Sequence, residues 1–548
     1  MRTTLIACAS LLFCVGAAAA AAACGSDESR STFDNGVDAG DEGSTTPTLP
    51  TDAAPIIHED FKEPVIDNGA PANAPAMFGA ADVAIPAGKT AACLHEPEIG
   101  TLFPKNWLRP RFVLSTSMEE NLFEIVMTIP NEKYPLRIYT KKSSGYAIDP
   151  VAWKKITAVG TGTVHLVVRS AVIDASGALT GGPFKAVEGD FEIAPVDATG
   201  SVLYWTTSNG TVLKGFTVGE ETTQPVITPQ SAATQCVACH TSTPDGLYAG
   251  LTASDAANNG TEPASIAIRT VDGKATEPPF LSPSAKNMLA RKNQHAPSFS
   301  KAHWKNGDHV VLSNWFNNGK TDLIWTDLEA ANENVGMGWG VLARNGDPGA
   351  AAASVAFSHD GNTVLYVSTK SSAAGVINSD GRLYTVPYAN RQGGNASAVT
   401  GASDATFTQY YPTFSADDKV IAFNRVPTGQ SSYNNKAAEV FVVPTGGGTA
   451  TRLAANDPPA CTNVKSPGIT NSWPKWSPEV KSSGGKDYYF LVFSSTRAAG
   501  GKPQLYVAPI VVEGGMVKTY ASLYLWNQPD TEANHTPAWD VFQLPGPR

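Results

Sequence analysis

The sequence predicts an all-β protein in which a six-bladed β-propeller follows an immunoglobulin- or fibronectin-like β-sandwich. Three observations lead to this fold class. The 548 residues include 49 Gly and 39 Pro but only 16% charged residues, a balance typical of turn-rich β-proteins. A strand–turn–strand pattern recurs six times in the C-terminal part of the chain. Roughly a hundred residues with alternating strand signals precede that repeat.

Each copy of the repeat contains a residue that ends one strand, a tight turn and a second apolar strand. In the third copy, Phe357-Ser358-His359-Asp360-Gly361 leads into the strand at 364–367. The residues aligned as equivalent lie 57 to 63 positions apart and are Ser242, Phe299, Phe357, Phe414, Trp476 and Trp539. A strand, an Asp-Gly hairpin, a second strand and a loop are the content of one propeller blade.

The last copy of the repeat ends at Arg548 with only its first strand present, whereas residues 201–217 form a strand–hairpin–strand that precedes the first copy. We therefore predict a propeller over residues 201–548, with 201–217 and 535–548 closing the last blade. Such closure removes two open sheet edges. A different blade number or an open sandwich is the alternative interpretation.

The turn in these copies resembles the Phe-Ser-Pro-Asp-Gly turn of the TolB-type propeller, and the resemblance covers about residues 201–548. It implies a scaffold that receives an envelope protein or peptide at the mouth of the central channel. Residues 94–197, where the sandwich is predicted, contain no catalytic pattern, so a spacer or docking role is expected there.

The N-terminus is typical of an exported bacterial lipoprotein. Arg2 precedes an apolar stretch at 5–15 that is too short to span a bilayer, and Ala22-Ala23-Cys24 resembles a lipobox. Residues 1–23 are thus predicted to be a signal peptide and Cys24 the lipidated residue, with an ordinary secretory peptide as the alternative. Because Gly25 and not Asp follows Cys24, the resemblance implies anchoring in the outer membrane, at its periplasmic face or at the cell surface.

Residues 24–85 are predicted to be a disordered acidic tether. The segment is rich in Ser, Thr, Gly, Asp, Pro and Ala and has almost no periodic apolar pattern, so it cannot bury enough surface to fold. The net charge of −10 is not accompanied by a basic stripe, which argues against nucleic acid as a partner. No glycine-rich phosphate loop or nucleophile elbow is present, so no nucleotide is expected.

One chemical motif stands out, the C-x-x-C-H sequence of Cys236, Cys239 and His240. This is the attachment pattern of c-type haem, in which two thioethers hold the porphyrin and the histidine is the proximal iron ligand. Attachment outside the cytoplasm agrees with export. A disulfide between the two cysteines, a metal site that includes His240, and a chance match are the alternatives.

The cysteine count agrees with an oxidising compartment. Removal of the signal peptide leaves Cys24, Cys93, Cys236, Cys239 and Cys461. If Cys24 carries lipid and the motif carries haem, Cys93 and Cys461 remain as a possible disulfide. The count is also even if Cys236 and Cys239 form a disulfide, so it does not decide between the two interpretations.

The repeat alignment suggests a second axial ligand for such a haem. In this alignment His240 takes the place of Pro297, Val355, Pro412, Pro474 and Pro537, near the channel mouth. His295 and His535 come two residues before that place in their own copies and are the first candidates. Met288 and Met337 are further candidates, since thioether ligands are common in cytochromes. A polar residue that lines the channel and binds water or backbone is the simpler role for either histidine.

These observations predict an exported lipoprotein whose propeller carries a single c-type haem and transfers electrons to a partner at the cell envelope. The alternative is a haem-free TolB-like scaffold that binds envelope proteins or peptides at the channel mouth. Redox catalysis on a small substrate is a third hypothesis, but no acid–base pair in the sequence supports an enzyme. The lipid anchor would make the membrane a further partner.

Overall fold

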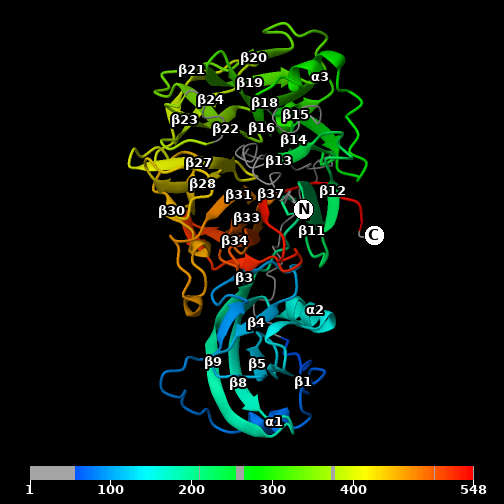
Figure 1. Cartoon of the computed structure of the whole chain (residues 1–548), viewed down its shortest axis with the longest axis vertical. Helices are drawn as coiled ribbons and strands as arrows, with labels where there is room; N and C mark the ends of the chain where they lie inside the picture. Colours follow the sequence, from blue (N-terminus) through cyan, green and yellow to red (C-terminus); the bar gives the residue numbers. More distant parts are fainter. Residues whose placement is uncertain (1–55, 209, 255–263, 372–376, 499, 547–548) are drawn as a thin grey trace, which may run out of the picture.

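The computed structural model describes residues 56–208, 210–254, 264–371, 377–498 and 500–546 (Figure 1). The predicted signal peptide, Cys24 and the first part of the predicted tether lie outside these ranges. The protein is all-β, as predicted, and its described residues include three short α-helices: Ala74–Met77 (α1), Pro150–Val159 (α2) and Pro283–Leu289 (α3). Among the described residues, no helix combines the length and apolar character needed to cross a membrane.

The C-terminal region contains six separate antiparallel sheets, here numbered sheet 1 to sheet 6. Sheet 1 consists of β13 (Cys236–Ser242), β14 (Tyr248–Ser254) and β15 (Ser265–Thr270). Sheet 2 consists of β16 (Gln294–Ser298), β17 (Trp304–Lys305), β18 (Asp308–Asn317), β19 (Lys320–Asp327) and β20 (Trp339–Val341). Sheet 3 consists of β22 (Ala351–Phe357), β23 (Thr363–Thr369), β24 (Arg382–Pro387) and β26 (Ser397–Ala398).

The remaining three sheets follow in chain order, except that the last one joins the two ends of the region. Sheet 4 consists of β27 (Phe407–Phe414), β28 (Val420–Pro427), β29 (Glu439–Pro444) and β30 (Thr451–Arg452). Sheet 5 consists of β31 (Asn471–Trp476), β32 (Lys481–Ser483), β33 (Lys486–Ser495), β34 (Gln504–Glu513), β35 (Met516–Thr519) and β36 (Leu523–Tyr524). Sheet 6 consists of β37 (Asn534–Asp540), β10 (Ser201–Thr206), β11 (Val212–Thr217) and β12 (Gln224–Ile227). A two-stranded parallel sheet pairs β21 (Arg344–Asn345) with β25 (Gly394–Asn395).

All six sheets share one irregularity, which identifies them as structural repeats. In each, the strand that begins the repeat carries one extra residue relative to its neighbour, a β-bulge. The bulges lie between Val237 and His240, His295 and Ser298, Ala353 and Ala356, Tyr410 and Thr413, Ser472 and Lys475, and His535 and Ala538. In five of the six, the residue after the first of each pair has a positive φ, from 46° at Ser354 to 64° at Trp473.

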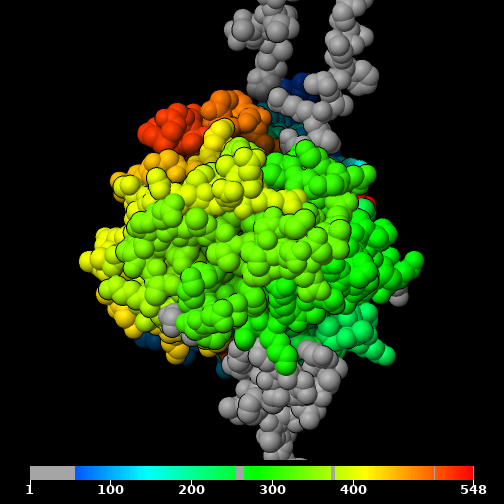
Figure 2. All heavy atoms as spheres, turned by 90° about the horizontal axis from the view of Figure 1, so that it is seen from above, coloured from blue at the N-terminus to red at the C-terminus, as the bar shows by residue number. Residues whose placement is uncertain are grey.

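The bulged strands pack against one another in sequence. Strand β13 contacts β16, which contacts β22, and the series continues through β27, β31 and β37 until β37 contacts β13. Strand β37 also pairs antiparallel with β10, with Val202 opposite Trp539, so that the C-terminal strand joins the hairpin at the start of the region. Figure 2 shows that sheets 2 to 4, coloured green to yellow, cover the end of the molecule opposite the N-terminal region.

The N-terminal region is built from two sheets and does not follow the predicted immunoglobulin-like pattern. A six-stranded sheet has the order β1 (Val65–Ile66), β6 (Leu136–Thr140), β5 (Leu122–Thr128), β8 (Gly162–Ile173), β9 (Leu179–Ile193) and β3 (Leu102–Phe103). A three-stranded sheet contains β2 (Cys93–Glu96), β4 (Arg111–Ser115) and β7 (Ser144–Ala147). Both edge strands of the larger sheet pair in parallel, and helix α2 is inserted between β7 and β8, whereas an immunoglobulin sandwich is built mainly from antiparallel strands. Local strand signals do not reveal such edge pairings.

The predicted tether is too long at its C-terminal end. Residues from 56 onward belong to the N-terminal region: β1 pairs with β6, and Ala74 and Phe78 are buried with Leu122 and Tyr139. A few widely spaced apolar residues hold this segment, and their spacing gives no periodic pattern from which order could be predicted.

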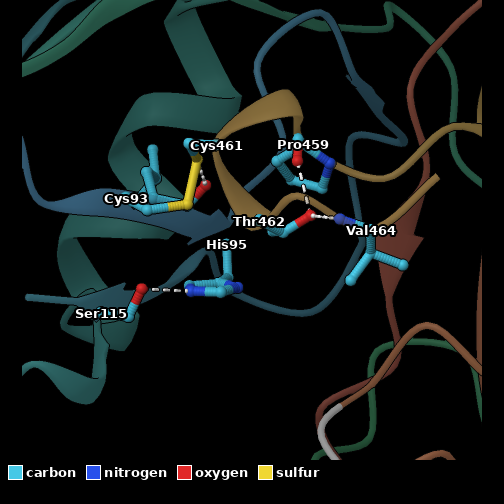
Figure 3. Close-up of a disulfide and its surroundings, with 8 residues drawn as sticks. Cys93, His95, Ser115, Pro459, Cys461, Thr462 and Val464 are labelled. Atoms are coloured by element: carbon cyan, nitrogen blue, oxygen red, sulfur yellow. Dashed lines mark hydrogen bonds between the residues drawn. A yellow bond between two sulfur atoms is a disulfide. The ribbon is translucent and has the colours of Figure 1, made fainter. Parts of the chain in front are cut away.

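The N-terminal region and sheets 5 and 6 share one hydrophobic core. The ring of Trp107 lies 5.5 Å from that of Trp539, and both side chains are buried with Leu523 of β36. A disulfide between Cys93 and Cys461 joins the start of β2 to the loop that follows sheet 4 (Figure 3). This is the pair that the cysteine count leaves over. The shared core and the disulfide fix the surfaces between which the candidate site lies.

Candidate functional site

The C-x-x-C-H motif forms the bulged strand β13 and is buried in the protein. Cys236, Cys239 and His240 expose 3%, 0% and 2% of their surfaces, and both cysteines are thiols. The bulge register shows that Cys239, and not His240, takes the place of Pro297, which corrects the sequence alignment by one residue. The first repeat lacks the aromatic residue of the other copies, so its register could not be read from the sequence.

Both ring nitrogens of His240 face backbone carbonyls. Nε2 lies 3.0 Å from the oxygen of Leu203 in sheet 6, and Nδ1 lies 3.3 Å from that of Ala238. Burial lowers the pKa of His240 to about 4, so the ring is neutral near pH 7 and donates from only one nitrogen. The contact with Leu203 links sheet 1 to sheet 6, which is a structural role.

This arrangement does not fit a covalently attached haem. A proximal histidine must present a nitrogen lone pair to iron, and two cysteines must reach the porphyrin edge together. Here the imidazole is enclosed by backbone, and Cys239 belongs to the apolar cluster of Tyr410, Tyr411 and Trp473. In the structure the motif is therefore a buried strand of the repeat.

Two of the candidate second ligands, His295 and His535, lie on β16 and β37, the bulged strands that contact β13. His295 and His535 occupy the same bulge position in sheets 2 and 6, and burial lowers the pKa of each to about 4. The ring of His535 lies 4.6 Å from that of Trp205. Met288 is buried in α3, whereas Met337 is 61% exposed. Within the described ranges, the hydrogen bonds of His240 go to the backbone of Leu203 and Ala238 and not to any of these four side chains.

A cavity that sequence reasoning missed lies between the three-stranded N-terminal sheet and sheet 5. Its volume is about 690 Å³, within the usual range for small-molecule sites, which often lie between domains. Its wall includes, from the N-terminal region, His95, Glu96, Glu98 and Arg111, and, from the C-terminal region, Pro459, Thr462, Val464, Arg497, Tyr506 and Tyr524. Figure 3 shows His95, Thr462 and Val464 beside the disulfide that joins the two walls.

Glu96 and Arg111 form a two-pronged ion pair in this wall. Nε and Nη2 of Arg111 donate to the two carboxylate oxygens of Glu96 at 2.9 and 2.7 Å. Burial raises the pKa of Glu96, and the hydrogen bonds from Arg111 oppose that rise. The side chains remain 17% and 26% exposed, so the pair can be reached from the cavity. Beside it, Nε2 of His95 lies 2.8 Å from Oγ of Ser115.

A second ion pair crosses from one region to the other. Oε1 of Glu98 accepts hydrogen bonds from Oγ of Ser522 at 2.8 Å and from Nη1 of Arg497 at 3.2 Å. The side chains are 8% and 3% exposed. Burial, only partly offset by Arg497, raises the pKa of Glu98 to about 6. Glu98 and Arg497 are 399 positions apart, so no local pattern could have paired them.

The raised pKa of Glu98 predicts a specific pH dependence of stability. Between about pH 4.5 and pH 6 the folded protein holds a proton that the unfolded chain releases, so the free energy of unfolding falls as pH rises through this window. The contribution of Glu98 is thus about 1–2 kcal/mol more favourable at pH 4.5 than above pH 6.5. We expect Glu98→Gln to remove this fall, as measured by urea denaturation across the pH range.

A carboxylate whose pKa is lowered in the folded protein provides the control. The pKa of Asp174 is lowered by a hydrogen bond from Ser176, so Asp174→Asn should alter the profile with the opposite sign. Identical profiles for wild type and Glu98→Gln would show that Glu98 is not buried as described.

Comparisons with known proteins leave the family open. No protein-family model matches the chain, and no curated protein matches it. Among solved structures, TolB from Acinetobacter baumannii is similar over 72% of this chain and 85% of its own, with 15% identity and a TM-score of 0.38. A puromycin hydrolase is similar over 66% of this chain and 52% of its own, with 13% identity and a TM-score of 0.31. Similarity at this level does not assign a fold or a function.

Proposed function

We propose that this protein is an exported binding protein in which a closed six-bladed propeller is the rigid scaffold and the cavity between the two regions is the ligand site. The main support for this proposal is the cavity. Its wall combines charged groups from both regions, and a disulfide and a shared core hold the two regions together. Rigid, preorganised walls reduce the entropy that a ligand must lose on binding.

The propeller part of the proposal is supported by the six equivalent bulges and by the contacts that run from each bulged strand to the next and back to the first. Export is supported by the disulfide between Cys93 and Cys461, because such bonds persist mainly in oxidising compartments. Lipidation at Cys24 and the outer membrane remain parts of the proposal. A peptide site at the channel mouth, implied by the TolB resemblance, stays a prediction.

We propose a haem-free protein, because the burial and hydrogen bonding of His240 do not suit a proximal ligand. The function that we propose is therefore ligand binding and not electron transfer. The envelope provides the setting in which the lipid anchor would hold the binding domain near its ligand.

The cavity is tested by filling it. Val464 lies half-buried in its wall (Figure 3), so Val464→Trp should block binding while leaving the two ion pairs in place. We expect the wild-type protein to retain at least one drug-sized compound from an envelope extract, the size that a cavity of this volume accepts, and the variant to lose it. Mass spectrometry of the compounds released on denaturation gives the result.

A surface change provides the control, since Val335→Trp alters an exposed valine in the segment between β19 and β20 and should retain the same compounds. If wild type and Val464→Trp retain the same compounds, the cavity is not the ligand site. The protein is produced together with c-type cytochrome maturation machinery, so covalent haem on Cys236 and Cys239 would contradict the haem-free assignment.

A further inference from the structure

Four of the five Asp, Glu and Arg side chains in the cavity wall are paired with one another, and this restricts the ligand. Glu96 is neutralised by Arg111, and Glu98 by Arg497. Asp530 also borders the cavity, but it is exposed to solvent. An ionic ligand would have to break a pair or enter the cavity without a counterion, and a partly buried charge without a partner is costly. The wall therefore favours an uncharged ligand.

The ion pair of Glu96 and Arg111 presents donors and acceptors side by side. Nε and Nη2 of Arg111 are occupied by Glu96, whereas Nη1 has no hydrogen bond to any residue within the described ranges. The Glu96 oxygens keep lone pairs beyond those used by Arg111. Adjacent hydroxyls, each able to donate and accept, match such an edge. A ligand with only acceptors could bind Arg111 but not Glu96, and a ligand with only donors could bind Glu96 but not Arg111.

The rest of the wall combines flat rings with small hydroxyl groups. Tyr524 of sheet 5 is half-buried, Tyr506 beside it is almost fully buried, and Pro459 lies in the loop that carries the disulfide. The Tyr524 and Pro459 rings can pack against the C–H faces of a flat, uncharged ligand, and the exposed hydroxyl of Ser144 lies in the same wall. Apolar faces and hydroxyl-bearing edges occur together in sugar rings.

We propose that the cavity binds a short neutral oligosaccharide, whose neighbouring hydroxyls bind the edge formed by Glu96 and Arg111. This rests on the cavity being a binding site, as proposed above. A peptide with blocked ends would also be uncharged, but each amide N–H only donates and each carbonyl only accepts, so it does not offer adjacent groups that do both. Peptides, anions and cations are therefore the competing outcomes of the test.

The test uses the whole mature protein and defined probes. Binding of maltotriose, cellotriose, xylotriose and chitotriose is measured by saturation-transfer NMR and calorimetry, beside citrate, spermidine and trialanine with acetyl and amide ends. We expect saturable binding of at least one of the four trisaccharides and none of the other three probes. Arg111→Lys keeps the charge but loses the planar fork, and it should weaken that binding about tenfold or more.

Arg452→Lys is the matched control, because Arg452 makes the same two-pronged contact with Glu439 in sheet 4, at 3.0 and 2.6 Å, outside the cavity wall. It should leave trisaccharide binding unchanged. If Arg111→Lys does not fold, loss of binding in Val464→Trp serves as the second readout.

Two results would overturn the assignment. One is that none of the four trisaccharides binds, and the other is that trialanine, citrate or spermidine binds and is lost in Val464→Trp. In either case the retention experiment above decides separately whether the cavity binds anything, so the ligand class and the proposed function fail in distinguishable ways.

Discussion

Replacing Arg497 with Met is expected to lower the free energy of unfolding by about 3–5 kcal/mol, because it leaves the Glu98 carboxylate buried without a counterion. Arg497 is almost fully enclosed, and its guanidinium lies 4.6 Å from the ring centre of Tyr506. It also donates to the backbone of Asn456 at 3.2 Å and to the side chain of Asn471 at 3.1 Å. Met keeps much of the volume but none of these donors. Urea denaturation followed by tryptophan fluorescence measures the loss.

A second substitution separates the charge effect from lost packing. In the double variant Arg497→Met with Glu98→Gln, the buried position no longer carries a charge, so part of the stability should return. Arg137→Met is the control, because Glu124 stays bonded to Nε of Arg169 at 2.6 Å when Arg137 is absent. That change should cost less than about 1 kcal/mol. Equal losses for Arg497→Met and Arg137→Met would contradict a buried pair between the two regions.

The sequence allowed the all-β class to be predicted because the strand–turn repeat is local. Phe357-Ser358-His359-Asp360-Gly361 closes a hairpin between β22 and β23, where Oγ of Ser358 donates to Asp360 at 2.6 Å. Residue types at adjacent positions were enough to find that turn. The β-bulge that precedes the turn could not be predicted from the sequence. An extra residue in a strand changes the face of the sheet on which the following side chains lie, but it does not change the residue types. This is why His240 was aligned with the prolines that correspond to Cys239.

The candidate site could not be predicted for a different reason. Its groups come from β2, β4, sheet 5 and the loop before it. Glu98 meets Arg497 only after the chain has passed through the N-terminal region and sheets 1 to 4. Single charged residues next to Pro97 or after Ser495 are not unusual in a sequence. They form a site because they are buried and because residues of one region face residues of the other. Both features arise from tertiary packing. The motif that did stand out, at Cys236 to His240, is part of a buried strand.

Replacing both Cys93 and Cys461 with Ala is expected to lower the free energy of unfolding by about 2–5 kcal/mol. The bond joins residues 368 positions apart, so in the unfolded chain it restricts a loop that includes most of the protein. The folded state should change little, because the core around Trp107 and Trp539 still holds the two regions together. Urea denaturation of wild type, wild type with reductant and the double variant measures the effect.

Reduced wild type provides the internal comparison, since Cys236 and Cys239 are already thiols and lie inside sheet 1. Reductant should therefore lower the stability of wild type to that of the double variant and leave the variant itself unchanged. If reductant destabilises the variant as well, a bond between Cys236 and Cys239 exists and the structure of the motif is wrong. If neither change affects stability, the two regions are held by their shared core alone, and the cavity walls owe their spacing to Trp107 and Trp539 and not to the disulfide.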